Sequence, residues 1–386
     1  MMGRLRVRDL AVMLAWLGAA GWAMGCEREG QGAAAKRAET AAVPVARVAR
    51  VPATTTGFDL AASERGALLA WARPRAQGGG IWLQLYDARG AVRGAPRRVA
   101  QTEAGGEVVE LAAIAVGRRN GLAWVESSAS ESRTRALLLR PDEPTPPEPT
   151  RIAEGAKVAA ASRTHLAIAA SQERLRVLYA DAPTACVDRS SAPCIGYGFS
   201  ELGDGARGGS RPWLAVPQPC TRGVPSLAAR DDRLYYAVCS TRAELPTTVA
   251  YSINVQTEYA RADEVLRGCD PLGLLALDDG ALLIADCGGV RRGVELTLAA
   301  QLPVERELAE REVVCSAGQA RLRAGGFELA LHGARERLES LLPDALAPPG
   351  ARAVWTGRAL LVAHPSPDGL ELLALACAGN ALKPVP

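Results

Sequence analysis

The sequence predicts an all-β fold, a β-propeller of seven four-stranded blades, with six blades as the alternative. A unit of two short apolar strands joined by a tight polar turn recurs seven times along the chain. A third and a fourth strand follow in most units, which gives meanders of about 47 residues, a typical length for a propeller blade. Radial stacking of such meanders hides most of their edges, so residues 57–386 are predicted to form one propeller.

The turns of the seven units consist of residues that tolerate positive φ angles or bond to nearby backbone. They are Ser63–Gly66, Gly117–Gly121, Ser162–Thr164, Arg230–Arg233, Asp278–Gly280, Ala324–Gly326 and Thr356–Arg358. The second strands that leave these turns are nearly continuous in apolar residues, which indicates burial on both faces. They are Leu68–Trp71, Leu122–Val125, Leu166–Ile168, Leu234–Ala237, Leu282–Ala285, Leu329–Leu331 and Leu360–Ala363.

Third and fourth strands complete most of the meanders. The predicted third strands are Ile81–Tyr86, Ala136–Leu139, Leu175–Tyr179, Val294–Leu298 and Leu370–Ala374. The predicted fourth strands are Arg98–Ala100, Arg151–Ala153 and Glu264–Leu266. Several third strands alternate apolar with polar residues, a period that is typical of β-structure.

The spacing of the units is uneven, with one long gap and one short gap. Residues 182–211, rich in Cys, Pro, Gly and Ser, are predicted to be a disulfide-stapled insertion on the propeller surface. The short final gap leaves the sixth blade incomplete, and its third strand near Arg337–Leu342 is either a strand or a helix. Two segments are candidates for the strand that closes the ring, Val43–Val51 and Ala381–Val385. Either would add an outer strand to the last blade, and the sequence does not choose between them.

The first 25 residues are typical of an export signal. Arg4, Arg6 and Arg8 precede the apolar stretch Leu10–Gly25, which at about 16 residues is shorter than a membrane-spanning helix. Small residues lead to Cys26, as at a signal-peptidase site. Residues 27–56 read as a flexible tether that starts with polar residues and carries no large apolar cluster.

This N-terminus resembles that of a bacterial lipoprotein, in which the cysteine at the first mature position carries diacylglycerol. The resemblance implies a signal peptide over 1–25, lipidation of Cys26 and a lipid-anchored tether over 26–56. Glu27 stands where an Asp commonly causes inner-membrane retention, so the outer membrane is expected. An ordinary secretory signal followed by a chance cysteine is the alternative.

The first unit carries a second resemblance. Ala67–Trp71 followed by Gly80–Gly90 is similar to repeats of secreted propeller proteins from GC-rich Gram-negative bacteria such as myxobacteria. The resemblance covers residues 60–100 best and supports the fold more than a function. Together with the N-terminus, it implies the cell envelope of a Gram-negative bacterium, on the periplasmic or the surface side.

Eight cysteines follow Cys26, an even number in a chain expected to enter an oxidising compartment, where disulfides are the default. They are Cys186, Cys194, Cys220, Cys239, Cys269, Cys287, Cys315 and Cys377. The ends of hairpin strands lie close enough for a disulfide, which predicts Cys220–Cys239 and Cys269–Cys287. Cys186–Cys194 would staple the insertion, and Cys315–Cys377 follows by elimination. The sequence has no C-x-x-C pair, so no metal site is predicted.

Searches for catalytic motifs give no candidate catalytic residue and no cofactor. The nucleophile elbow, the zinc-protease motif and the phosphate-binding loop are absent from the sequence. His332 and His364 follow strands of neighbouring late units and read as isolated side chains. Trp71 and Trp124 occupy equivalent strand positions and are predicted to lie in the core, whereas Trp213 after the insertion is the candidate for an exposed binding contact.

The formal charge is +3, and removal of residues 1–25 leaves about +1, which gives no electrostatic case for nucleic-acid binding.

From these observations together, we expect a monomeric, lipid-anchored, non-catalytic scaffold that binds or assembles a protein partner in the envelope. In architecture and anchoring it would resemble the propeller lipoprotein that helps to assemble outer-membrane barrels. There are two alternatives. One is a propeller enzyme, either a lyase or a hydrolase, with its site at the tunnel mouth, and the other is a glycan-binding module. Charged groups that converge at the tunnel mouth would favour the enzyme, and a flat aromatic rim would favour a partner surface.

Overall fold

The computed structural model describes residues 47–51, 57–63, 65–103, 106–128, 131–141, 143, 145–156, 166–184, 194–203, 206–207, 211–217, 226–242, 245–254, 260–277, 280–297, 304–316, 319–331 and 338–385, some of them by their backbone alone. The chain divides into two compact units, Met1–Ala42 and Val43–Pro386. All described residues belong to the second unit, so the signal segment and Cys26 lie outside them. Within the described ranges, no helix is long and apolar enough to cross a membrane.

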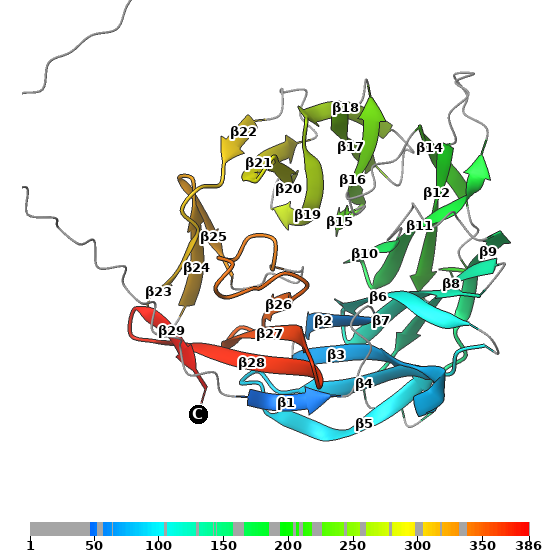
Figure 1. Cartoon of the computed structure of the whole chain (residues 1–386), viewed down its shortest axis with the longest axis horizontal. Helices are drawn as coiled ribbons and strands as arrows, with labels where there is room; N and C mark the ends of the chain where they lie inside the picture. Colours follow the sequence, from blue (N-terminus) through cyan, green and yellow to red (C-terminus); the bar gives the residue numbers. More distant parts are fainter. Residues whose placement is uncertain are drawn as a thin grey trace, which may run out of the picture. The chain divides into compact units, whose positions relative to one another are not determined.

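Seven antiparallel sheets follow one another along the chain and are arranged as a β-propeller, as predicted (Figure 1). Blade 1 consists of β2 (Phe58–Ser63), β3 (Gly66–Arg73), β4 (Gly80–Tyr86) and β5 (Val92–Ala100), with the short helix η1 (Arg75–Gln77) between β3 and β4. Blade 2 consists of β6 (Glu107–Val116), β7 (Arg119–Ser127), β8 (Glu131–Leu139) and β9 (Thr150–Ala156). Blade 3 consists of β10 (Leu166–Ser171), β11 (Arg174–Thr184), β12 (Cys194–Gly203), β13 (Ala206–Arg207) and β14 (Arg211–Pro217).

The later blades follow in the same order. Blade 4 consists of β15 (Ser226–Arg230), β16 (Arg233–Arg242), β17 (Leu245–Asn254) and β18 (Ala260–Arg267). Blade 5 consists of β19 (Asp270–Leu277), β20 (Gly280–Cys287), β21 (Val290–Thr297) and β22 (Val304–Glu307). Blade 6 consists of β23 (Glu312–Ser316), β24 (Gln319–Ala324) and β25 (Phe327–Ala330). Blade 7 consists of β26 (Arg352–Trp355), β27 (Ala359–Ser366) and β28 (Gly369–Ala378), with β1 (Arg47–Val51) and β29 (Ala381–Pro384) paired to β28.

The core lies between the blades, because each second strand is apolar on both of its faces. In β3, Leu68 and Ala70 pack against blade 2, whereas Leu69 and Trp71 pack against blade 7. The two-residue period of a strand produces this alternation. Trp71 and Trp124 are fully buried in these interfaces, which confirms that both belong to the core.

The first strands lie around the axis. β2 contacts β6, β6 contacts β10, β10 contacts β15, β15 contacts β19, and β26 contacts β2. In blades 1, 2, 4 and 5 the remaining strands follow outward in sequence order, whereas in blade 7 β1 lies outside β28.

The ring closes on β28, and both candidate closing segments are used. β1 pairs antiparallel with the first half of β28, at Leu370–Leu373, and β29 pairs with its second half, at Leu375–Ala378. The two alternatives left open by the sequence are therefore not exclusive. Because β1 lies inside the stretch expected to be tether, the propeller begins before residue 57.

Two units are displaced by one strand from their predicted places. Leu166–Ile168, predicted to be a second strand, lies in β10, the first strand of blade 3, and Leu175–Tyr179 lies in the second strand, β11, instead of a third. Leu329 and Ala330, predicted to open a second strand, lie in β25, the third strand of blade 6.

The physical reason for the displacement in blade 3 is the turn between β10 and β11. It consists of Gln172 and Glu173, with φ angles of 50° and 61°. Long side chains rarely adopt this left-handed conformation, so the sequence does not mark the turn. In blade 6 the predicted turn at Ala324–Gly326 is real, but it joins the second and third strands. Of the segment Arg337–Leu342, predicted to be a strand or a helix, the described residues Leu338–Leu342 form turns and bends instead.

The stretch 182–211, expected to be an insertion, mostly continues blade 3. β11 extends to Thr184, which pairs with Cys194 at the start of β12. The stretch therefore lengthens a hairpin of the blade. Residues 185–193 lie outside the described part, so the Cys186–Cys194 bond stays a prediction.

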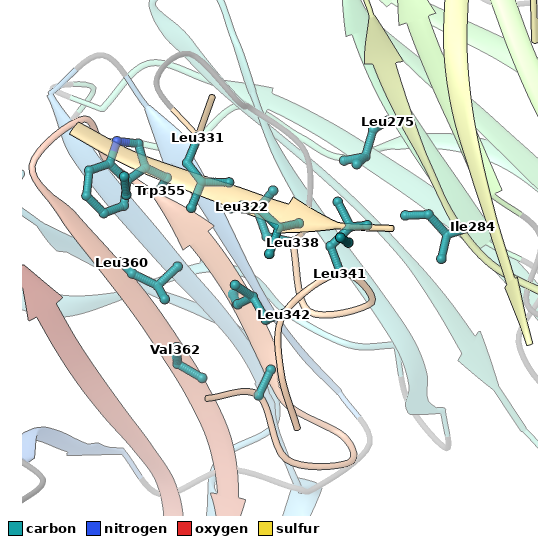
Figure 2. Packing of buried hydrophobic residues seen from close by; sticks show 14 of the residues in the cluster. Leu275, Ile284, Leu322, Leu331, Leu338, Leu341, Leu342, Trp355, Leu360 and Val362 are labelled. Atoms are coloured by element: carbon teal, nitrogen blue, oxygen red, sulfur yellow. The ribbon is translucent and has the colours of Figure 1, made fainter. Parts of the chain in front are cut away.

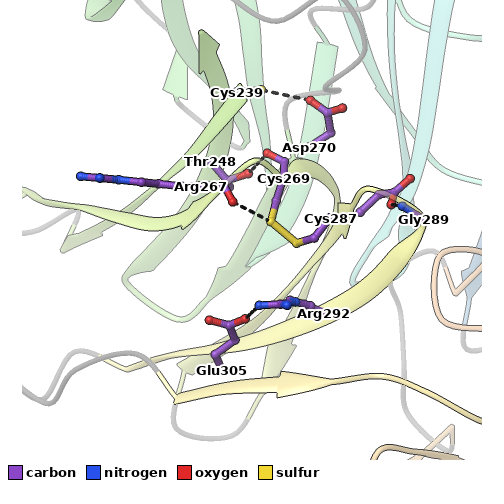
Figure 3. Close-up of a disulfide and its surroundings, with 10 residues drawn as sticks. Cys239, Thr248, Arg267, Cys269, Asp270, Cys287, Gly289, Arg292 and Glu305 are labelled. Atoms are coloured by element: carbon purple, nitrogen blue, oxygen red, sulfur yellow. Dashed lines mark hydrogen bonds and ion pairs between the residues drawn. A yellow bond between two sulfur atoms is a disulfide. The ribbon is translucent and has the colours of Figure 1, made fainter. Parts of the chain in front are cut away.

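Two of the four predicted disulfides are confirmed, Cys269–Cys287 and Cys315–Cys377. The first joins the ends of the β19–β20 hairpin (Figure 3). The second joins β23 of blade 6 to β28 of blade 7. Cys239 is also disulfide-bonded, but Cys220 lies outside the described residues, so their pairing stays a prediction.

Blade 6 has three strands in the described part of the chain, and its first strand is placed differently from the others. Apart from its sheet partner β24, β23 contacts β28 and β29 of blade 7. The segment Leu338–Ala351 fills the adjacent interior, where Leu338, Leu341 and Leu342 are fully buried. These leucines pack among β20, β24 and β27 (Figure 2). A leucine-rich loop thus replaces an inner strand between blades 5 and 7.

Candidate functional site

A cavity of about 400 Å³ lies at the axis. The first strands supply apolar residues to its wall, such as Leu60, Ile114, Ile168 and Leu227. The segment Leu338–Ala351 completes the wall and brings charged side chains to it.

On that segment, Asp344 is held by two arginines. Arg291 Nη2 lies 2.9 Å and Arg311 Nη2 lies 3.3 Å from Asp344 Oδ1. Arg291 Nη1 also donates to the carbonyl of Ser340 at 2.6 Å, and Arg311 Nη1 donates to that of Leu342 at 2.7 Å. These bonds fasten the loop to blades 5 and 6.

A second charged group joins blades 1, 2 and 7. Arg352 Nε lies 3.5 Å from Asp59 Oδ1, and Arg352 Nη1 lies 3.7 Å from Glu339 Oε1. Asp59 is completely buried, and its Oδ2 accepts a hydrogen bond from the Ala113 amide at 2.7 Å. Carboxylates and arginines do converge here, but they bind one another and thereby stabilise the ring.

A larger cavity of about 750 Å³ opens where the hairpin turns of blades 1, 2 and 3 meet. Its described lining contains five arginines and one carboxylate, Arg65, Arg93, Arg118, Arg119, Arg140 and Glu173. Arg65 and Arg118 lie in the β2–β3 and β6–β7 turns, Arg93 lies in β5, and Arg140 directly follows β8. We refer to this site as the arginine cavity.

The meander explains why these arginines lie together. In an antiparallel sheet, the connection between the first and second strands lies at the same end as that between the third and fourth. Each blade therefore presents both connections on one face of the propeller. Arg65, Arg118 and Arg140 lie in three of these connections, and Arg93 lies at the start of β5 beside the fourth, so their positive charges gather on that face.

The blade 2 wall of the arginine cavity contains a buried amide. Asn120 in β7 is 2% exposed, and it shares a strand face with Leu122 and Trp124, which pack against blade 1. Its Nδ2 is buried and has no hydrogen-bond partner within the described part of the chain. An unpaired buried donor costs about 1–3 kcal/mol, so a ligand acceptor that reaches Asn120 gains a strong contact.

The turns around the cavity are bonded to one another from blade to blade. Arg119 Nη2 donates to the carbonyl of Glu173 at 2.6 Å, and Ser171 Oγ donates to that of Asp231 at 2.9 Å. Arg230 Nη1 continues the pattern to the carbonyl of Leu277 at 3.1 Å. The first of these bonds joins two residues that line the cavity, and the other two continue the pattern to blades 4 and 5.

Glu173 is placed in the cavity by its backbone. The two-residue turn that carries it joins β10 to β11 and has positive φ at both Gln172 and Glu173, as in a type I′ hairpin turn. Its carboxylate lies over Gly117, where a Cβ atom would overlap it. The turn, the Arg119 bond and the glycine together position one carboxylate among the arginines.

Most of the predicted site residues lie outside this region. Cys26, Cys186 and Cys220 are not among the described residues, and Trp213 lies in the backbone of β14, with its side chain undescribed. The lipidation of Cys26 and a binding role for Trp213 therefore stay predictions. His364 Nε2 lies 3.8 Å from Glu371 Oε2, its cross-strand neighbour. No group of three or more His, Cys, Asp or Glu that could hold a metal occurs in the part of the chain that the structure describes.

The sequence reading missed the arginine cavity, although part of its signal was visible. Arg65 and Arg118 were interpreted as turn residues of blades 1 and 2, which they are. Their shared face, and the addition of Arg93 and Arg140, depend on the packing of two blades. A search for arginines at equivalent turns of neighbouring repeats would have found the cluster.

No protein-family model and no curated protein matches this sequence. Solved structures match at low identity. A Trypanosoma rangeli sialidase is 11% identical with a TM-score of 0.39, over 77% of this chain and 57% of that chain. The polysaccharide lyase Uly1 is 8% identical with a TM-score of 0.44, over 83% and 78%. A prolyl endopeptidase is 14% identical with a TM-score of 0.45, over 85% and 49%. This chain thus spans about half the length of the sialidase and the endopeptidase, and at these values no activity transfers to it.

Proposed function

We propose that the protein is a non-catalytic binding module of the bacterial cell envelope that holds an anion-bearing ligand or partner in the arginine cavity. In this proposal a lipid on Cys26 anchors the chain, and residues between Cys26 and β1 connect the anchor to the propeller. The fold acts as a rigid frame that brings turns from three blades to one site.

The observation that carries the proposal is the gathering of five arginines around a cavity with a buried, unpaired amide. A guanidinium offers planar paired donors that match the oxygens of carboxylate, phosphate or sulfate. Glu173 is the one carboxylate in the described lining, so the cavity has an excess of positive charge. Such a concave charged site concentrates anions and accelerates their association.

The axial cavity gives the enzyme alternative less support. Its arginines and carboxylates bond to one another or to backbone carbonyls. A reaction there would first have to break bonds that join blades 1, 2 and 7. We therefore place the ligand at the turns and assign the axial groups to stability.

The test is calorimetric titration of the purified protein with two small polyanions, tripolyphosphate and trigalacturonate. Arg118 and Arg140 are exposed, so Arg118→Gln/Arg140→Gln should fold normally. The double variant is expected to weaken binding about tenfold or more, because hydrogen bonds to charged groups contribute about 1.5–3 kcal/mol each.

The control is Arg75→Gln/Arg358→Gln, which removes the same charge from exposed positions outside the cavity. It should bind both ligands as the wild type does. If both double variants lose the same affinity, the effect is due to net charge and not to the cavity. If the wild-type protein binds neither ligand, the proposal is wrong.

The anchor is tested separately by the intact mass of protein extracted from membranes. A chain that starts at Cys26 with added acyl mass supports the lipid anchor. A mature chain without acyl mass, released in soluble form, contradicts it and leaves the cavity proposal untouched.

A further inference from the structure

We infer that the ligand of the arginine cavity is an acidic saccharide, a chain of hydroxyl-rich units that carry carboxylates, and that Glu173 selects it by accepting hydrogen bonds from its hydroxyls. The inference rests on the proposed function, since it assumes that the cavity binds anions. It adds the class of ligand and the residue that discriminates.

The size of the cavity excludes a single small anion as the fitting occupant. About 750 Å³ lies in the range of pockets that enclose molecules of drug size, roughly 300–1,000 Å³. One phosphate or acetate group would leave most of it unfilled. A segment of two or three sugar units fits this volume better.

The positions of the arginines indicate several separated charges on the ligand. Arg65, Arg118 and Arg140 lie in three different connections of two blades, and Arg93 lies at the start of β5. A ligand with one carboxylate per unit offers a partner to several of them at once. A compact anion can reach only the nearest.

Glu173 is the feature that a purely anionic ligand does not explain. Its carboxylate would repel every ligand oxyanion nearby, yet the turn, the Arg119 bond and Gly117 keep it in the cavity. A carboxylate can only accept hydrogen bonds, so its ligand partner must donate. A hydroxyl beside a ligand carboxylate meets this requirement without losing the arginine contacts.

Asn120 adds the complementary group. Its Nδ2 is a buried donor without a partner among the described residues, and placing a charged group beside it would carry a desolvation cost that a neutral hydroxyl avoids. The Glu173 carboxylate accepts hydrogen bonds and the Asn120 amide donates them. A sugar hydroxyl can do both, so it matches this pair. The described lining offers only small apolar surfaces, such as Ala67, Leu85 and Pro141, where a peptide would need apolar anchoring pockets.

The experiment compares two probes with three carboxylates each, trigalacturonate and an N-acetylated, C-amidated triglutamate. Both are titrated into the wild-type protein, Glu173→Gln and the control Glu307→Gln, an equal charge change at an exposed position elsewhere. We expect trigalacturonate to bind at least tenfold more tightly than triglutamate. In Glu173→Gln this ratio should fall about fivefold or more, while Glu307→Gln keeps the wild-type ratio.

The outcomes separate the inference from the function on which it rests. If both probes bind equally, or if Glu173→Gln changes both affinities by the same factor, the saccharide assignment is wrong and the anion-binding function stands. If neither probe nor tripolyphosphate binds more tightly to the wild type than to Arg118→Gln/Arg140→Gln, the function itself falls. Thermal unfolding of each variant verifies that it is folded.

Discussion

Removal of the Cys315–Cys377 disulfide should destabilise the protein more than removal of Cys269–Cys287. The first bond closes a loop with a sequence separation of 62 and the second one of 18. In the chain-entropy model, a cross-link stabilises by restricting the unfolded chain, which gives about 4 kcal/mol for the longer loop and about 3 kcal/mol for the shorter. The structure adds a local reason, since β23 belongs to a three-stranded blade and is tied by this bond to blade 7.

The assay is equilibrium unfolding in urea, under non-reducing conditions, of Cys315→Ser/Cys377→Ser and of its matched control Cys269→Ser/Cys287→Ser. We expect the first variant to lose about 1 kcal/mol more than the second. Hydrogen exchange should also show faster exchange in β23–β25 of the first variant alone. An equal or larger loss in the Cys269–Cys287 variant, with unchanged exchange in blade 6, would refute this reasoning.

Three further predictions concern stability and the cavity. Asp59→Asn should lower the free energy of unfolding by about 1–3 kcal/mol, because it weakens a buried carboxylate that bridges Ala113 and Arg352; unchanged urea unfolding would contradict this. Gly117→Ala should lower the free energy of unfolding by about 1 kcal/mol, because φ is 55° at this position. The added Cβ should also displace the Glu173 carboxylate, so that tripolyphosphate binds more tightly. Weaker or unchanged binding would show that the displacement does not occur. Burial raises the pKa of Tyr86 to about 12, above its unfolded value of about 10, so the unfolded chain ionises first and stability should fall from pH 10 to 12. Tyr86→Phe should make that fall shallower by about one proton in unfolding measured against pH, and an identical slope would contradict the burial of the hydroxyl.

The sequence predicted the repeat because the repeat is local. In blades 1, 2, 4, 5 and 7 the hairpin turns contain Gly, Asp, Ser or Thr, and the second strands appear where the pattern places them. The strands of a meander are similar to one another, however, so an apolar run in the sequence does not show which strand of the blade it forms. The turn at Gln172–Glu173 lacks the usual residues, so the assignment moved by one strand in blade 3.

The candidate site could not be predicted in the same way, because it is built from three blades. Arg65, Asn120 and Glu173 come from different repeats, and only the packing of one blade on the next brings them to one cavity. The sequence predicted the two segments that close the ring, but not that both are used. It does not show that β28 is long enough to pair with β1 and β29 at the same time.

The sharing of β28 has a consequence for the order of events during synthesis. β1 leaves the ribosome before any other described strand, while its partner β28 is made near the end, together with β29. The interface between blades 7 and 1, with Trp71 and Leu361, therefore stays uncovered until almost the whole chain exists. Contacts between such distant segments form slowly, so a chain in which β28 has not yet been made exposes this apolar surface and is open to aggregation or chaperone binding until the strand arrives.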